Sequence, residues 1–440
     1  MSTFGIPNVA PELEAQLISQ MADVESLLRS HTRSEYPFVD ETAHHLVAAG
    51  GKRLRPLLTL LTAQYGNPEA NGVIAAAVAC EITHLATLYH DDVMDEAPLR
   101  RGVESANMRW GNTIAILTGD FLFAKSSDLL ADLGPEAVRL QARTFERLVI
   151  GQIMETQGPN SGQDPLEHYL KVVADKTGSL IAASARYGGM VSGAPAEITD
   201  TVTVFGEKIG VAFQLADDVI DIASESNQSG KTPGTDLREG VPTLVTLNVM
   251  KSSDPADAEL KRLLSAPITD EPTVQQVLVA LRNHKALDES RQQLLQVAKE
   301  ARGALGPLPI NNATGALMSL CDAVIDRSAF FYLGYLIYIG NQGTGQFGLH
   351  WGLTLLLMSA GAVTAIPLLL FNGSATRLPF TTIGLLQYIT PTLQFSVGVW
   401  IRHEDMPTAR WVGFLIIWVS LTTLAIDLVR SGRAVNNSVA

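Results

Sequence analysis

Two aspartate clusters hold the residues whose types and spacing could do chemistry. The first covers Asp91–Asp95 and the second Asp217–Asp221, and both follow the pattern DDxxD. In a helix, the first and last Asp of such a cluster lie on one face, four residues apart. Each cluster closes a strongly apolar stretch, where carboxylates need a positive partner. Magnesium, which prefers oxygen ligands and accompanies phosphates, is the partner that this pattern predicts.

Basic residues upstream of the first cluster could bind a diphosphate. The segment GGKRLRP at 50–56 has two glycines that permit a tight turn, followed by several cations. A helix that starts there would present Lys52 and Arg55 on one face. His84 lies seven residues before Asp91, two helical turns back on the same face. A buried core histidine and a ligand-binding histidine are both consistent with that position.

More polar residues follow each cluster. Arg100 and Arg101 come directly after the first and suit bidentate contacts with two anionic groups. The segment Asp175–Gly178 is expected to open a helix with a cation and a hydroxyl. Gln214 precedes the second cluster by one turn, and Lys231 lies in the polar stretch after it. Structural salt bridges would also explain such acids and bases, but they rarely concentrate at the ends of the most apolar helices.

The elements that must position these residues are expected to be helices throughout 10–328. This region has no sustained period-two alternation and no hairpin signal. The polar stretches Gly158–Pro165 and Ser224–Thr235 are predicted loops, and the second is either a lid or an ordinary surface connection. The apolar helical segments are Ile74–Tyr89, Asn112–Leu133, Glu136–Gln157 and Val202–Ile222.

Composition limits the classes of function. The 440 residues exceed the usual size of one domain, and the net charge of −13 argues against a nucleic-acid partner. Cys80 and Cys321 form no disulfide or zinc pattern, which indicates a reducing compartment. The N-terminus has no pattern of a signal peptide. We therefore expect a cytoplasmic catalytic domain.

The last part of the chain differs in kind. We expect a domain at 1–328 and a membrane segment at 329–440 of three to four transmembrane helices, because stretches of about 20 apolar residues recur there. Trp and Arg flank them, as interface anchors do. Three interpretations of this tail remain: a membrane anchor, a fusion and a transporter remnant. The stretches are Leu349–Phe371, Pro379–Ile401, Trp411–Val429 and the weaker Ala329–Phe347.

The motifs GGKRLRP, HDDVMD, RRG, KTGSL and FQLADDVID, in this order, closely resemble those of the trans (all-E) polyprenyl diphosphate synthases. The surroundings GQIMETQGP and DLREGVPTL look like actinobacterial members associated with menaquinone side chains. The likeness covers nearly all of residues 10–328. It implies an all-α fold, the isoprenoid-synthase helical bundle around a central cavity, and a homodimer. The segments VTAIPLLLF and RWVGFLIIW in the tail resemble the C-terminal end of the drug/metabolite transporter superfamily, in its chloramphenicol-sensitive permease branch.

The resemblance also implies roles for the site residues. It implies three Mg²⁺ ions held by Asp91, Asp95 and Asp217, with Asp92, Asp218 and Asp221 completing the two walls. Isopentenyl diphosphate would be bound by one basic group of residues and the allylic diphosphate by another. The first group is Lys52, Arg55, His84 and Arg101, and the second is Arg100, Lys176, Thr177, Gln214 and Lys231. Gln152 and Val241 depart from the residues that many members carry, Glu and Lys respectively.

The implied reaction is condensation of isopentenyl diphosphate onto an allylic diphosphate. The product should grow down the cavity along the helix before Asp91. Residues 85–88 are expected to form the floor of that cavity. Ala86 is small where short-product members tend to place an aromatic ring, so we expect a long product, heptaprenyl to nonaprenyl. A geranylgeranyl synthase, a class I terpene cyclase and a binding-only regulatory subunit are the alternatives. The two intact DDxxD clusters speak against the last two.

Overall fold

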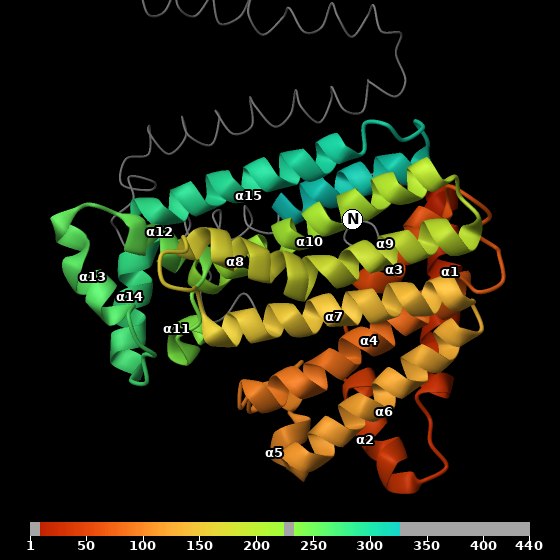
Figure 1. Cartoon of the computed structure of the whole chain (residues 1–440), viewed down its shortest axis with the longest axis horizontal. Helices are drawn as coiled ribbons and strands as arrows, with labels where there is room; N and C mark the ends of the chain where they lie inside the picture. The colour runs from red at the N-terminus through yellow and green to blue at the C-terminus, as the bar shows by residue number, and fades with distance from the viewer. Residues whose placement is uncertain (1–8, 224–232, 326–440) are drawn as a thin grey trace, which may run out of the picture. The chain divides into compact units, whose positions relative to one another are not determined.

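The computed structural model describes residues 9–223 and 233–325, and helices make up most of them (Figure 1). Besides the helices, a two-stranded hairpin is formed by β1 (Leu99–Arg100) and β2 (Val103–Glu104), in which Arg100 pairs with Val103. The helices are α1 (Pro11–His31), α2 (Pro37–Ala48), α3 (Leu54–Ala63), α4 (Val73–Met94), α5 (Ala106–Trp110), α6 (Asn112–Ala131), α7 (Pro135–Gln157), α8 (Pro165–Val173), α9 (Ser179–Ser192), α10 (Ala196–Ala223), α11 (Thr235–Glu239), α12 (Leu244–Lys251), α13 (Ala258–Leu263), α14 (Glu271–Arg282) and α15 (Lys285–Ala304), with a π-turn at Ala174–Gly178, a 3₁₀ turn at Pro255–Asp257 and a further helix at Asn312–Ile325.

Helix α4 lies in the centre of the main hydrophobic core. It packs against α1, α3, α6 and α9, and side chains such as Ile82, Leu85 and Tyr89 are completely buried. Within the described residues, only α4 is long and apolar enough to cross a membrane, and 67% of that stretch is buried inside the protein. Its apolar residues therefore belong to the core, and its acidic residues are Glu81, which pairs with Arg53 at 2.8 Å, and the aspartates at its C-terminal end.

Close contacts between helices bring α9 against α3 and α10. A Cβ atom at Gly188 of α9 would lie 2.1 Å from the carbonyl oxygen of Thr59 on α3. A Cβ atom at Gly206 of α10 would likewise lie 2.8 Å from the Cα of Ala182 on α9. Glycine permits this distance because it has no side chain. These contacts hold α3, α9 and α10 closely together, and α10 carries the second aspartate cluster.

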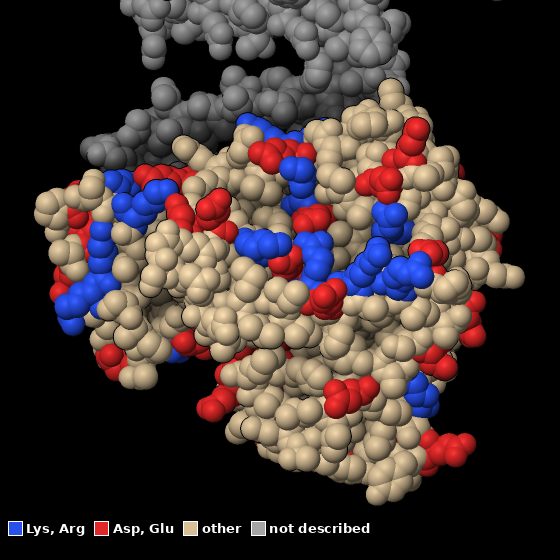
Figure 2. Space-filling model, in the orientation of Figure 1, with Lys and Arg blue, Asp and Glu red and all other residues tan. Residues whose placement is uncertain are grey.

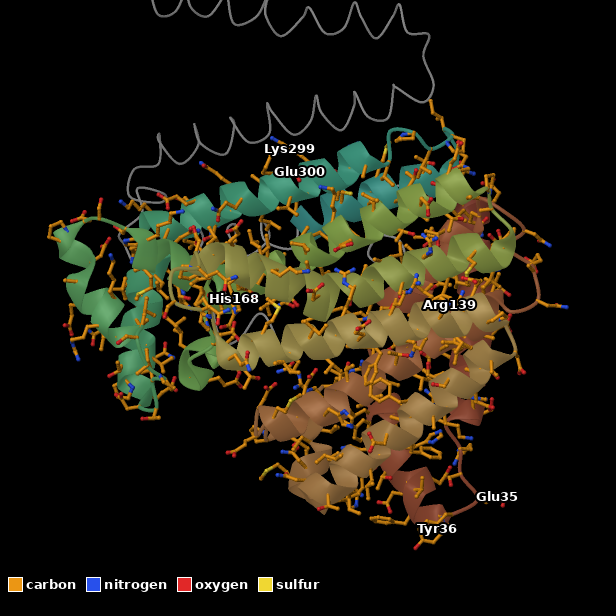
Figure 3. All side chains as sticks on the ribbon, in the orientation of Figure 1. Glu35, Tyr36, Arg139, His168, Lys299 and Glu300 are labelled. Carbon is orange, nitrogen blue, oxygen red and sulfur yellow. The ribbon has the colours of Figure 1, made fainter. Side chains whose placement is uncertain are left out.

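Helix α10 joins two hydrophobic cores. Leu215 packs in the main core, while Val219 and Ile222 pack with α11, α12 and α14 in a second one. Helix α15 runs along α10, and Glu300, labelled in Figure 3, pairs with Lys208 of α10 at 3.0 Å. The second aspartate cluster therefore lies where α10 passes from one core to the other.

The all-helical prediction is confirmed for the described residues, with two local corrections. Arg100 and Arg101 belong to a short hairpin, for which the sequence showed no signal, and Arg101 and Gly102 adopt positive φ angles of 54° and 80° there. The segment Asp175–Gly178 does not open a helix, since a π-turn joins α8 directly to α9. The predicted loop Gly158–Pro165 lies between α7 and α8. Most of Ser224–Thr235 and the whole predicted membrane segment lie outside the described residues.

Candidate active site

The first aspartate motif lies at the C-terminal end of α4. Asp91 is half-buried, Asp95 is exposed at the helix cap, and Asp92 is completely buried. The Nε atom of Arg100 lies 2.5 Å from Oδ1 of Asp92. The other oxygen of Asp92, Oδ2, is buried without a hydrogen-bond partner. Asp92 therefore ties the hairpin arginine to the motif, while Asp91 and Asp95 remain one turn apart on the helix.

Burial raises the pKa values of the carboxyl groups in this motif. The pKa of Asp91 rises to about 6, first through burial and also through the charge of Asp95, although Lys176 opposes the rise. Partial burial of its carboxyl group likewise raises the pKa of Asp95, against the opposing charges of Lys176 and Arg100. Desolvated carboxylates that repel one another favour a bound cation.

The second motif is organised around Asp218, which is buried and fully engaged by the protein. Its Oδ1 accepts a hydrogen bond from Nε2 of Gln214 at 3.1 Å, and its Oδ2 accepts from the Leu244 amide at 3.2 Å and from the Tyr169 hydroxyl. Burial raises the pKa of Asp218 to about 6. Its neighbours Asp217 and Asp221 are half-buried. Asp218 thus positions the motif by linking α8, α10 and α12.

Charges from both motifs reach Glu239, and charges from the first motif reach Lys176. Lys176 Nζ lies 2.5 Å from Oε2 of Glu155, and although burial opposes it, the charges of Glu155, Asp91 and Asp95 raise the pKa of Lys176. The pKa of Glu239 is raised first by partial burial and then by Asp95, and Asp221 of the second motif adds to the rise. The electrostatic fields of the two aspartate motifs therefore overlap.

Sequence reasoning missed Glu155 and Glu239. Glu155 comes three residues after Gln152 on α7, and the amide of Gln152 donates a hydrogen bond to it at 3.1 Å. Glu239 lies at the end of the short helix α11. No sequence signal singled out either residue, since α7 also carries Glu136 and Glu146.

The π-turn presents Lys176 and Thr177 towards the two motifs. The Thr177 hydroxyl donates a hydrogen bond to the amide oxygen of Gln214 at 3.3 Å. Since Gln214 in turn donates to Asp218, the predicted Lys–Thr pair and the second motif form one connected network. The predicted Lys231 lies outside the described residues.

The predicted basic cluster gathers beside the first motif. Burial, followed by the charges of Arg55 and Arg101, holds the pKa of His84 well below its usual value, so His84 is neutral at physiological pH. The Nε atom of Arg55 is buried without a hydrogen-bond partner, and the charge of Asp91 reaches this guanidinium. Arg101 lies 3.8 Å from Glu81. An arginine with a buried, unsatisfied donor is suited to an anionic ligand.

The cations of GGKRLRP do not act alike. Arg53 is buried with a positive φ of 51°, and it pairs with Glu25 at 2.5 Å and Glu81 at 2.8 Å. Lys52 is exposed before the helix, which starts only at Leu54. The expectation that Lys52 and Arg55 share one helical face is therefore wrong, because Lys52 precedes the helix.

The carboxylates fit a divalent cation that also binds a phosphate ligand. They offer only oxygen donors, and Asp92 keeps a buried oxygen without a partner. Among the described residues, no group of three or more His, Cys, Asp or Glu side chains is gathered to form a metal site. Mg²⁺ suits such a site because it takes one or two carboxylates and completes its shell with water and phosphate oxygens.

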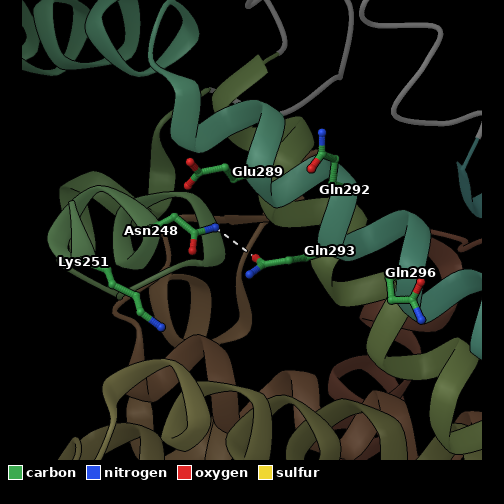
Figure 4. A pocket seen from close by; sticks show the side chains of 6 residues that line it. All are labelled: Asn248, Lys251, Glu289, Gln292, Gln293 and Gln296. Carbon is green, nitrogen blue, oxygen red and sulfur yellow. Dashed lines mark hydrogen bonds between the residues drawn. The ribbon is translucent and has the colours of Figure 1, made fainter. Parts of the chain in front are cut away.

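A polar pocket between α12 and α15 lies apart from these residues (Figure 4). The amide of Asn248 donates a hydrogen bond to Gln293 at 3.0 Å across it. None of the predicted site residues lines this pocket, so it is no part of the candidate site. Its lining residues are Asn248, Lys251, Glu289, Gln292, Gln293 and Gln296.

The fold and the site together define a helical enzyme for phosphorylated substrates. The polyprenyl synthetase model matches residues 36–281. Over 308 residues the chain is 49% identical to nonaprenyl diphosphate synthase of Mycobacterium tuberculosis, covering 70% of this chain and 92% of the relative. It is 36% identical to heptaprenyl diphosphate synthase component 2 of Geobacillus stearothermophilus, with 69% and 94% covered.

A solved structure also matches. Geranylgeranyl pyrophosphate synthase of Corynebacterium glutamicum, complexed with calcium and isoprenyl diphosphate, is 43% identical with a TM-score of 0.66, covering 72% of this chain and 98% of that chain. The chain therefore belongs to the polyprenyl synthetase family. It is a prenyltransferase.

We predict that Mg²⁺ binding weakens as the pH falls through about 6. The proton and the metal compete for Asp91, whose pKa of about 6 lies above its usual value, so the group protonates two pH units earlier than an exposed Asp. Between pH 7 and pH 5 the dissociation constant, measured by calorimetric titration, should rise about tenfold. Asp91→Asn should bind more weakly and flatten the dependence, whereas Asp128→Asn, an exposed carboxylate, should not. A constant affinity from pH 5 to pH 7 contradicts this prediction.

Proposed function

We propose that the protein condenses isopentenyl diphosphate with an allylic diphosphate and makes a long-chain all-trans polyprenyl diphosphate for a menaquinone-type quinone. The observation that best supports this proposal is the electrostatic attraction between Lys176 and the carboxylates of Asp91 and Asp95 at the end of α4. The curated relatives, a nonaprenyl and a heptaprenyl synthase, support a long product.

The two substrates would occupy different sides of the first motif. The allylic diphosphate would lie against Lys176, Thr177 and Gln214, with Arg100 and Lys231 adding charge. Isopentenyl diphosphate would lie against Arg55, His84 and Arg101, with Lys52 at the rim. This division would bring the two substrates next to each other, as condensation requires.

Bond cleavage needs a stabilised leaving group. When the allylic C–O bond breaks, the electron pair remains on the diphosphate and an allyl cation forms. Lys176 and Arg100 would supply positive charge where that negative charge develops. Asp91, Asp95 and Asp217 would hold Mg²⁺, three ions by the proposed division, and these ions would neutralise the diphosphate. The isopentenyl double bond then attacks the cation, and a proton is lost to the released diphosphate.

Asp91→Ala should lower kcat by about 10²-fold or more, because it removes a metal-holding charge present in the transition state. Labelled isopentenyl diphosphate, farnesyl diphosphate and Mg²⁺ provide the assay. Asp288→Ala, which breaks an exposed ion pair with Arg291 on α15, is the control and should be fully active. Full turnover by Asp91→Ala would contradict the proposed function.

Product length should depend on Ala86. This residue is completely buried in α4, and its carbonyl oxygen lies beside Gly119 of α6. Ala86→Phe would add a ring one to two turns from Asp91, so the major product should lose several isoprene units. Chromatographic sizing of the products measures this, with circular dichroism as the control for folding. A folded variant with an unchanged product would show that the floor lies elsewhere.

We also propose that a second copy binds over α6 and α7. In Figure 2 uncharged surface predominates over α6, whereas charged side chains gather over part of α7. Large apolar side chains are exposed there, including Leu117 at 57% and Ile153 at 49%. Ile116, Val149 and Ile150 continue the patch. Pairing with a second copy would bury this surface. Sedimentation velocity should find a dimer, and a monomer at micromolar concentration would refute it.

Residues 329–440 would anchor the enzyme to the cell membrane, with the catalytic domain in the cytoplasm. The support is the length of the apolar stretches in that segment and their flanking Trp and Arg residues. A lipid-soluble product makes such a location useful. The full chain should float with lipid vesicles while a chain ending at 328 should not, and equal behaviour would contradict the anchor.

A further inference from the structure

One face of α7 supports the π-turn that carries Lys176. Arg147, Gly151 and Glu155 follow one another at four-residue spacing and so line one side of the helix. We propose that these three residues, the α7 cradle, set the position of Lys176 and through it the binding of the allylic diphosphate. The proposal rests on the role that the proposed function gives to Lys176.

Arg147 holds the start of the π-turn by charge. Its Nε lies 2.8 Å from Oδ1 of Asp175, the residue before Lys176, and its Nη2 lies 2.7 Å from Oε1 of Glu207 on α10. Lys171 pairs with the second oxygen of Asp175 at 2.8 Å. The Asp175 side chain is only 4% exposed. Removing a partner of a buried carboxylate is costly, so Arg147 fixes this backbone between α7 and α10.

Gly151 brings the two backbones into contact. A Cβ atom at this position would lie 2.7 Å from the backbone nitrogen of Lys176. Hydrogen bonds of the i→i+5 type are rare and form mostly single turns at functional sites, so a π-turn needs support from its neighbours. Direct contact with α7 supplies that support at Lys176 itself.

Glu155 fixes the other end of the same lysine. Its Oε2 accepts from Nζ of Lys176 at 2.5 Å and from Nε2 of Gln152 at 3.1 Å. The cradle therefore holds Lys176 at its backbone and at its ammonium group. Because the lysine must meet the diphosphate at a defined place, a displacement of about 1 Å costs as much as 10²-fold in rate.

Arg147 is best tested because it is not among the residues assigned to either substrate. Arg147→Gln should raise KM for farnesyl diphosphate about tenfold, through displacement of Lys176, and leave KM for isopentenyl diphosphate unchanged. Arg147→Lys, which keeps the charge, should restore part of the loss. The matched control is Arg139→Gln on the same helix, where an exposed arginine (labelled in Figure 3) pairs with Glu136 at 2.5 Å. This control should behave as the unmodified protein.

The kinetic results separate an error in the α7 cradle from an error in the role of Lys176. Equal kinetics for Arg147→Gln and Arg139→Gln refute the cradle, and so does an equal rise of both KM values, which indicates general disruption. If Lys176→Ala leaves KM for farnesyl diphosphate unchanged, the role of Lys176 in the proposed function is wrong instead. Should Arg147→Gln fail to fold, by circular dichroism, Gly151→Ala gives the same test, because its added methyl group presses on the Lys176 nitrogen.

Discussion

Negative charge held in a partly buried space is the constraint on which this structure depends. Asp91 and Asp218 have pKa values near 6 because burial removes their hydration. Such groups are unfavourable unless cations or hydrogen-bond donors compensate them. The protein supplies donors for Asp218 and a lysine near Asp91. The remaining imbalance around the first motif favours a ligand that brings cations of its own.

The bundle makes this arrangement possible through the two helices that carry the motifs. Helix α4 is buried along most of its length, and α10 is shared by two hydrophobic cores. Charged residues at the ends of such helices are held in place, since closely packed interiors resist displacement. The energy for holding the carboxylates close together thus comes from apolar contacts elsewhere in the bundle.

The helical class, both aspartate motifs and most of their basic neighbours could be predicted from the sequence, because helical periodicity and charge type determine them. The different environments of Arg53 and Arg55 could not, since they depend on one left-handed residue and on Glu25 and Glu81 from other helices. The sequence did not indicate the π-turn either. Gly178 suggests a break, yet the backbone continues when α7 and α10 pack against it. Tertiary contacts of this kind leave no local pattern.

The π-turn has a consequence for the length of the chain. A π-turn holds one residue more than an α-helical turn, and one residue corresponds to about 100° of rotation along a helix. Both flanks have defined contacts. The Tyr169 hydroxyl donates a hydrogen bond to Asp218, and Gly188 packs closely against the backbone of Thr59. Losing a single codon between them would twist one flank away from its anchor. Between these two points, homologous chains should therefore vary in residue type but not in residue number.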